Sequence, residues 1–224
     1  MSALTADYEN VCLSGNLKFD LAFFKKIFKK DSAFRIKKIN STQKNNISCA
    51  LVYFDGMVDS TQLNEAVIKP ILLVDLPNIS GSLSEYFEKQ VLFARDTKRT
   101  SSVSKIIEGI LYGEALVLIN GSPEALMVDA KGWRTRGIKE PDDERVLQGP
   151  REGFDEAALL NVSLIRRKLQ TPDFCSEVIR VGRRTSTMVF ICYLNSLTDQ
   201  KRLSVLKEKI KNIDIDGILD SNYI

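Results

Sequence analysis

The chain of 224 residues contains no histidine. Histidine is the usual base that activates serine and cysteine nucleophiles, and it is a common zinc ligand. Its absence excludes Ser-His-Asp and Cys-His catalysis, histidine-liganded zinc and imidazole acid–base chemistry. An enzyme with this sequence would have to use carboxylates, lysine or tyrosine, and no pair of such groups demands a catalytic interpretation. The sequence predicts a protein that is not an enzyme and that needs no cofactor or metal.

The sequence also lacks long apolar runs and paired cysteines. Its longest apolar run, residues 188–194, has the length of a strand, whereas a membrane-spanning helix needs about 18 or more apolar residues. Residues 1–10 do not have the pattern of a signal peptide. The four cysteines, Cys12, Cys49, Cys175 and Cys192, form no CxxC pair. We therefore expect a soluble piece of chain with free thiols in a reducing cytosol.

A strong charge of one sign is absent as well. The chain carries 32 basic and 29 acidic residues, and the formal net charge is only +3. This excess is too small to indicate a nucleic-acid partner. Hydrophobic residues at 44% and charged residues at 27% are typical of a globular chain with a core.

Residues 20–28 have apolar side chains at helical spacing, with Asp20 in position to cap the helix. Lysines lie between and after the apolar residues, at Lys25, Lys26, Lys29 and Lys30. Such a helix packs on a core with a solvated basic face, or it lies on an anionic membrane. The first interpretation is the more common one.

The rest of the chain alternates between helical and strand patterns. Helices are predicted at residues 61–73 (with Pro70 kinking or ending the helix), 82–93, 102–111, 156–169 and 198–211. Strands are predicted at residues 47–54, 115–119, 125–128, 177–181, 187–194 and 215–219. We expect an α/β (mixed α+β) fold of two small α/β subdomains, each a small mixed sheet flanked by helices. The subdomains are predicted to cover residues 1–140 and 141–224, because residues 131–144 are polar and aperiodic.

A turn rich in special residues precedes the helix at residues 156–169. It consists of Gly149, Pro150, Arg151, Glu152, Gly153 and Phe154. Asp155 is expected to cap the helix, and Phe154 and Leu159 to form a hydrophobic staple. Arg166 and Arg167 suit the negative end of the helix dipole. The expected buried stripe consists of Ala158, Val162, Ile165 and Leu169.

Three interpretations of this turn remain open. It is a structural turn with an internal Arg–Glu pair, a contact with another subunit or the membrane, or an anion site formed by Arg151 and helix amides. A contact is favoured over an anion site because Glu152 and Asp155 would repel an anion. Two further groups have the residue types of a binding site: Asp142-Asp143-Glu144 those of a cation site, and Arg180, Arg183 and Arg184 those of a phosphate site. In both cases a charged, solvated loop is the simpler explanation.

The motif GPREGF, followed by Asn161 and by Arg166-Arg167, resembles the signature of the A subunits of GerA-type spore germinant receptors. Other segments agree with this family in the same order: EGILYGEALVLINGSPEALMVDAKGW, GIKEPDDE, VGRRTSTMVFICYLNSL and IDIDGILDSNYI. The resemblance extends from about residue 101 to residue 224. Before residue 101 only the pattern of helices and strands is similar.

The resemblance implies the soluble N-terminal domain of an A subunit, on the core side of the spore inner membrane, in which the full-length subunit is embedded. The implied role is signalling and assembly in nutrient-triggered germination. The implied partners are the B and C subunits, other A subunits and a small-molecule germinant. The alternative is a germinant sensor with a ligand cleft between the two subdomains. The candidate ligand or interface residues are Gly149, Pro150, Arg151, Glu152, Gly153, Phe154, Asn161, Arg166 and Arg167.

Overall fold

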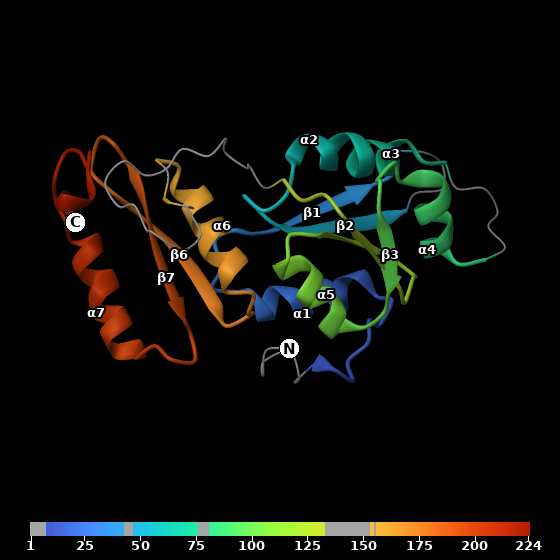
Figure 1. The fold of residues 1–224 in the computed structure, drawn as a ribbon, viewed down its shortest axis with the longest axis horizontal. Helices are drawn as coiled ribbons and strands as arrows, with labels where there is room; N and C mark the ends of the chain where they lie inside the picture. The colour runs from blue at the N-terminus through green and yellow to red at the C-terminus, as the bar shows by residue number, and fades with distance from the viewer. Residues whose placement is uncertain (1–7, 43–46, 76–80, 133–152, 155) are drawn as a thin grey trace, which may run out of the picture.

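The computed structural model describes residues 8–42, 47–75, 81–132, 153–154 and 156–224, and these residues form two antiparallel sheets (Figure 1). The larger sheet has five strands in the order β1-β2-β4-β5-β3. These strands are β1 (Phe34–Asn40), β2 (Ser48–Phe54), β3 (Thr97–Thr100), β4 (Ala115–Ile119) and β5 (Ala125–Val128). The smaller sheet is a hairpin of β6 (Phe174–Val181) and β7 (Thr187–Leu194).

The five-stranded sheet lies between two layers of helices. Successive side chains of a strand point to opposite faces, so Val52 and Leu116 contribute to one core while Leu51 and Val117 contribute to the other. The first core is covered by α1 (Leu17–Ile27) and α5 (Val103–Leu111) (Figure 1). The second is covered by α2 (Ser60–Leu63), η2 (Asn64–Ile68), α3 (Lys69–Leu73), α4 (Leu83–Tyr86) and η3 (Phe87–Val91). Because both faces are covered, the central strands are almost wholly apolar.

The helix predicted at residues 61–73 is continuous but changes its hydrogen-bonding pattern. In the π-helical segment η2, the N–H of Lys69 donates to the carbonyl oxygen of Asn64, five residues earlier. Pro70 then stands in the first turn of α3, where a missing N–H costs little. Pro70 therefore marks a change of helix type, and the helix continues past it.

The hairpin has one helix on each face. Helix α7 (Gln200–Lys211) buries Leu203 and Ile210 against Ile179, Val181 and Ile191. Helix α6 (Ala158–Lys168) covers part of the other face and lies between the hairpin and the five-stranded sheet (Figure 1). The chain ends in the short 3-10 helix η4 (Ser221–Tyr223). Gly182 starts the β6–β7 turn with a φ of +90°, as a glycine there readily does.

The predicted mixed α/β class is confirmed, with some corrections to its parts. Both sheets are antiparallel, whereas mixed sheets were expected. Strands β1 and β3 were not predicted, because their lysines and arginines weaken the apolar pattern. Residues 215–219 are not a strand; they run beside the hairpin turn, where Arg183 N–H donates to the Ile215 carbonyl at 2.9 Å.

Two further predictions concern the start of α1 and the border between the two subdomains. Asp20 does not cap α1, because the helix begins one turn earlier with Asn16 as its N-cap. The Asp20 carboxylate instead accepts hydrogen bonds from the N–H and Oγ of Ser14. The subdomain boundary at residue 140 lies outside the described residues and stays a prediction.

Candidate functional site

The nine candidate residues fall into three groups. Four of them, Gly149, Pro150, Arg151 and Glu152, lie outside the described residues, as do Trp133, Asp155 and residues 142–144. Gly153 and Phe154 are exposed, and 72% of Phe154 is accessible to solvent. Asn161, Arg166 and Arg167 lie on α6, and the structure separates them by environment: Arg166 is buried while the other two are partly exposed.

Helix α6 differs from its prediction in both its start and its buried face. It begins at Ala158 with Ala157 as N-cap, while the predicted cap, Asp155, lies outside the described residues. Its buried residues are Val162, Ser163 and Arg166, and the expected stripe is only partly buried. The reason is that α6 contacts both sheets. We call the five-stranded sheet with its helices the first unit and the hairpin with α7 the second unit. A helix that lies between the two units buries residues on more than one side, and these residues need not be its most apolar ones.

Arg166 joins the two sheets. Only 1% of the residue is accessible, and its guanidinium forms an ion pair with the carboxylate of Asp31, whose side chain is also buried. The guanidinium carbon also lies 3.9 Å from the ring centre of Phe54, the last residue of β2. It lies 4.8 Å from the ring centre of Phe174, the first residue of β6. One side chain from α6 thus contacts the ends of both sheets and the segment after α1.

The Arg166 guanidinium is incompletely satisfied. Burial lowers the pKa of Arg166 to about 9, so the group is still charged at neutral pH. Its Nε and Nη1 atoms have no hydrogen-bond partner among the described residues. A buried donor without a partner costs about 1–3 kcal/mol. From the sequence, Arg166 was explained by its favourable position at the negative end of the helix dipole. In the structure it is buried instead, and only some of its N–H groups have hydrogen-bond partners.

Main-chain hydrogen bonds also join the two sheets beside Arg166, and we call this region the junction. The segment after α1 pairs with β6: Ser32 N–H donates to the Ser176 carbonyl at 2.6 Å, and Ser176 N–H donates to the Lys30 carbonyl at 3.1 Å. The hydroxyl oxygens of Ser32 and Ser176 are 3.0 Å apart. The segment after α1 therefore forms an isolated parallel β-bridge with β6, between Asp31 and Ser176.

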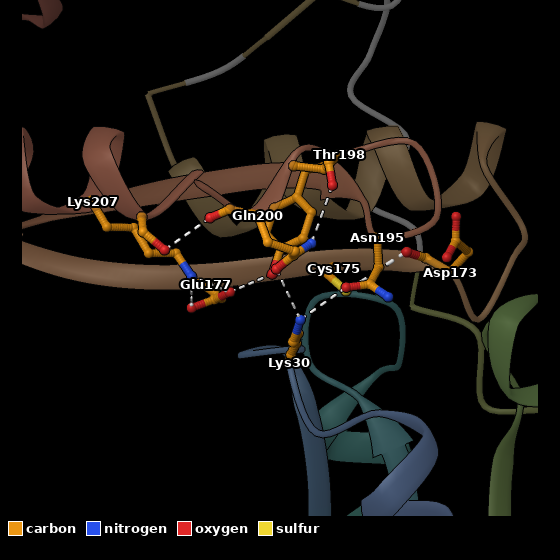
Figure 2. Close-up of polar contacts among 10 residues, drawn as sticks. Lys30, Asp173, Cys175, Glu177, Asn195, Thr198, Gln200 and Lys207 are labelled. Atoms are coloured by element: carbon orange, nitrogen blue, oxygen red, sulfur yellow. Dashed lines mark hydrogen bonds and ion pairs between the residues drawn. The ribbon is translucent and has the colours of Figure 1, made fainter. Parts of the chain in front are cut away.

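A polar network lies at the surface beside this contact (Figure 2). Lys30 Nζ donates to Asn195 Oδ1 at 2.8 Å and to Gln200 Oε1 at 3.4 Å. Glu177 accepts hydrogen bonds from Lys207, at 2.6 and 2.7 Å, and from the hydroxyl of Tyr193. The network connects the turn after α1 with β6, β7 and α7 across the junction.

Hydrogen bonding controls the ionisation of this network. Burial raises the pKa of Glu177, but the hydrogen bonds from Lys207 and Tyr193 outweigh this effect and hold it below its ordinary value. The pKa of Tyr193 is raised, first by burial and then by its hydrogen bond to Glu177. Glu177 is therefore a carboxylate at neutral pH, and Tyr193 keeps its proton as a donor.

An open hollow of about 390 Å³ lies where the two units meet. Its lining consists of Lys29, Lys30, Asp31, Ser32, Ser176, Glu177 and Val178. Both signs of charge are present, from the lysines of the first unit and from Glu177 of the hairpin. A small molecule with both charges matches this lining better than a simple anion does.

Three of the four cysteine thiols are poorly suited to act as nucleophiles. Burial raises the pKa of the Cys175 and Cys192 thiols, and it raises that of Cys49 to about 12, so these thiols are protonated at neutral pH. Among the described residues, no cluster of three or more potential metal ligands occurs. In the same residues no helix is both long and apolar enough to cross a bilayer.

The arginines of the β6–β7 turn are engaged with the C-terminal segment. Arg183 forms a two-pronged ion pair with Asp214, in which Nε lies 2.6 Å from Oδ1. Arg184 lies 3.7 Å from a carboxylate oxygen of Asp216. These contacts explain the turn without a phosphate ligand.

Sequence reasoning missed the partners of Arg166. Asp31 is 135 residues away in the chain, and Phe54 and Phe174 belong to different sheets. The available signal was Asp31 itself, an acidic residue that directly follows two lysines. Nothing in that pattern identifies Arg166 as its partner.

The fold is similar to that of a solved structure. The crystal structure of the N-terminal domain of the A subunit of the Bacillus megaterium spore germinant receptor GerK3 matches with a TM-score of 0.66. The match covers 95% of this chain and 78% of that one, at 20% sequence identity. The class of protein defined by the fold is thus a mixed α/β domain, with the fold of that N-terminal domain.

The sequence match identifies the family. Residues 22–224 match the family model described as Bacillus/Clostridium GerA spore germination protein, and the chain belongs to this family. Spore germination protein KA of Bacillus subtilis is 30% identical over 96% of this chain and 39% of its own length. The membrane protein YfkQ of the same organism is 30% identical over 80% of this chain and 35% of its own length. The chain thus spans less than two-fifths of these relatives, and the resemblance to GerA-type A subunits is confirmed.

Proposed function

We propose that this chain is a non-enzymatic signalling and assembly domain of a germinant receptor A subunit. In this proposal it lies on the core side of the spore inner membrane, and its partners are the B and C subunits and other A subunits. It transmits germinant binding elsewhere in the complex to the membrane part of the receptor. Membership of the GerA family and the fold of an A-subunit N-terminal domain support the proposal.

The observation that carries the signalling role is the buried contact of Arg166. It connects the ends of both sheets through Asp31, Phe54 and Phe174, yet two guanidinium donors lack partners among the described residues. An ion pair with unmatched donors is a costly way to build a purely static core. Such an ion pair suits two units that adopt two arrangements, with the contact stronger in one arrangement than in the other. A partner that binds one arrangement better then shifts the balance between them.

The assembly role is assigned to the turn at residues 149–154. These residues precede α6 in the sequence by only a few positions, so in this proposal a partner bound there would act on the helix that carries Arg166. Phe154 is 72% exposed, which leaves an aromatic side chain available to a partner. Asn161 and Arg167 on the partly exposed side of α6 extend the proposed surface.

Substitution of Arg151 tests the assembly role. Arg151→Ala in the full-length receptor is expected to reduce co-purification of the B and C subunits with the A subunit. The melting temperature of the 224-residue chain should stay unchanged. If the isolated chain instead loses its stability, Arg151 is a structural residue and the turn is not an interface.

The second candidate function is a germinant sensor, and the hollow at the junction favours it. The hollow has lysines on one side and Glu177 on the other, a lining suited to an amino acid with both charges. Thermal unfolding of the chain with a panel of amino acids, sugars and nucleotides tests this function. A ligand at 100 times its dissociation constant adds about 2.7 kcal/mol to the free energy of unfolding. A shift with one germinant class supports the sensor, and no shift across the panel contradicts it.

A further inference from the structure

The outward face of α1 carries a stripe of lysines. Six exposed residues of this helix and of the turn after it recur at helical spacing and so share one face. They are Lys18, Phe19, Ala22, Lys25, Lys26 and Lys29, and we call them the basic ridge. Lys30 in the same turn is also exposed, but it binds Asn195 and Gln200. The opposite face of the helix, with Phe24 and Phe28, is buried in the first core. The amphipathic character noted in the sequence therefore serves the core, and the ridge needs its own explanation.

The lysines of the ridge have no ionic partners in the described part of the chain. The acidic residues in the same stretch, Asp20 and Asp31, are buried and bind Ser14 and Arg166. On the opposite layer of helices the arrangement differs. There Lys69 pairs with Glu65 at 3.1 Å and Lys89 pairs with Glu85 at 2.6 Å, each at i,i+4 spacing.

Helix stability does not account for the ridge. Lys25 and Lys26 suit the negative C-terminal end of α1, but Lys18 lies in its first turn, where the helix dipole disfavours a cation. Lys25 and Lys29 are spaced as like charges four residues apart, which is also unfavourable. The stability of α1 thus explains Lys25 and Lys26 but not Lys18.

The stretch of chain that carries the ridge is rich in basic residues. Residues 18–38 contain eight of the 32 basic residues, although the whole chain has a net charge of only +3. The only acidic residues in this stretch, Asp20 and Asp31, are buried, so its exposed charges are all positive. The neighbouring helix α5 adds exposed Lys105 and one exposed acid, Glu108.

We propose that the basic ridge binds the surface of a bilayer that contains anionic phospholipids. Lysine side chains are long and flexible, and on a convex helix they reach a planar layer of negative headgroups without a fitted pocket. Phe19 is 72% exposed beside Lys18, and an aromatic side chain in that position enters the headgroup region. An acidic protein would match the charge, but it would leave Phe19 without an apolar contact unless it also presented a pocket.

Vesicle sedimentation tests the proposal. The 224-residue chain is mixed with vesicles of phosphatidylcholine alone, or of phosphatidylcholine with phosphatidylglycerol, at increasing salt. Binding is expected only with the anionic vesicles, and it should weaken as salt increases. Replacing Lys18, Lys25, Lys26 and Lys29 with Gln should lower binding more than about 100-fold, because each lysine near an anionic surface contributes about five-fold.

The matched control replaces four exposed lysines elsewhere, Lys98, Lys201, Lys209 and Lys211, with Gln. It makes the same change in net charge and should alter binding less than about five-fold. Equal losses in the two variants, or no binding of the unmodified chain to anionic vesicles at low salt, would overturn the proposal. Ridge-dependent binding to polyglutamate without binding to vesicles would also overturn it and assign the ridge to an acidic protein. The salt dependence of the unmodified chain tests the proposal even if a variant does not fold.

Discussion

Arginine at position 166 combines two interactions that few other side chains can make together. Its guanidinium forms an ion pair with Asp31 and its central carbon lies over the rings of Phe54 and Phe174. Lysine would keep the charge but would not offer the planar, delocalised group. The residue therefore connects three segments: the turn after α1, the end of β2 and the start of β6.

Removal of the charge at position 166 leaves the Asp31 carboxylate buried without its partner. Arg166→Met is expected to lower the free energy of unfolding by about 3–5 kcal/mol. The double variant Arg166→Met, Asp31→Asn should lose less than the sum of the single losses, because both charges are gone. Urea unfolding of the four proteins measures this coupling. Arg184→Met, at an 83% exposed side chain, is the control and should change stability by less than about 0.5 kcal/mol. Additive losses would contradict a direct pair.

Glu177 gives the junction a pH dependence. Its pKa in the folded protein lies below its ordinary value of 4.5, so the ionised form stabilises the fold at higher pH. This contribution is fully present above pH 4.5 and is lost as the pH falls through the lower folded value. Glu177→Gln should thus destabilise the chain at pH 7 but have a much smaller effect at about pH 3. Urea unfolding at both pH values checks this. An equal difference at the two values would show that Glu177 acts through packing alone.

At the scale of elements, a strand could be predicted from the sequence when it lies at the centre of the sheet but not when it lies at the edge. The central strands β4 and β5 were predicted at their observed boundaries, because both are apolar runs closed by turn residues. The edge strands β1 and β3 were missed, since edge positions tolerate exposed lysines and arginines that discourage unwanted pairing. Helix α6 was predicted, but its buried face was not, because that face depends on two surfaces that come together only in the fold.

Gly132 allows two chain segments to approach closely after β5. Its N–H donates to the Met57 carbonyl at 3.1 Å, and a Cβ atom here would lie 2.3 Å from the backbone nitrogen of Asp59. Gly132→Ala should therefore lower the free energy of unfolding by about 1–3 kcal/mol, because backbone has to move. Gly217→Ala is the control, since its Cβ would meet only a Thr185 methyl group, at 3.1 Å. Thermal unfolding compares them. Equal stability of the two variants would contradict the close approach.

At the scale of the whole molecule, the chain consists of two sheets held by a small set of contacts. The sequence predicted the α/β class and placed Arg166 among nine candidates, because helical and strand periodicities and the GPREGF motif are local features. It did not reveal the junction, because the Asp31–Arg166 pair and the Ser32–Ser176 contact depend on segments more than a hundred residues apart. The proposed signalling role depends on movement at this junction.

A disulfide across the junction would prevent that movement. The hydroxyl oxygens of Ser32 and Ser176 are 3.0 Å apart, so cysteines at these positions are close enough to be bridged. The pair Ser32→Cys, Ser176→Cys is made in a Cys192→Ser background, because Cys192 lies opposite Ser176 in the hairpin. The single variants Ser32→Cys and Ser176→Cys in the same background are the controls.

The most direct test is germinant-triggered loss of optical density in spores whose full-length receptor carries this pair. The account predicts that oxidised spores fail to respond, that a reductant restores the response, and that the single variants respond under both conditions. Receptor abundance, followed by immunoblot, should be the same throughout. A normal response from spores with the disulfide formed would contradict signalling through the junction.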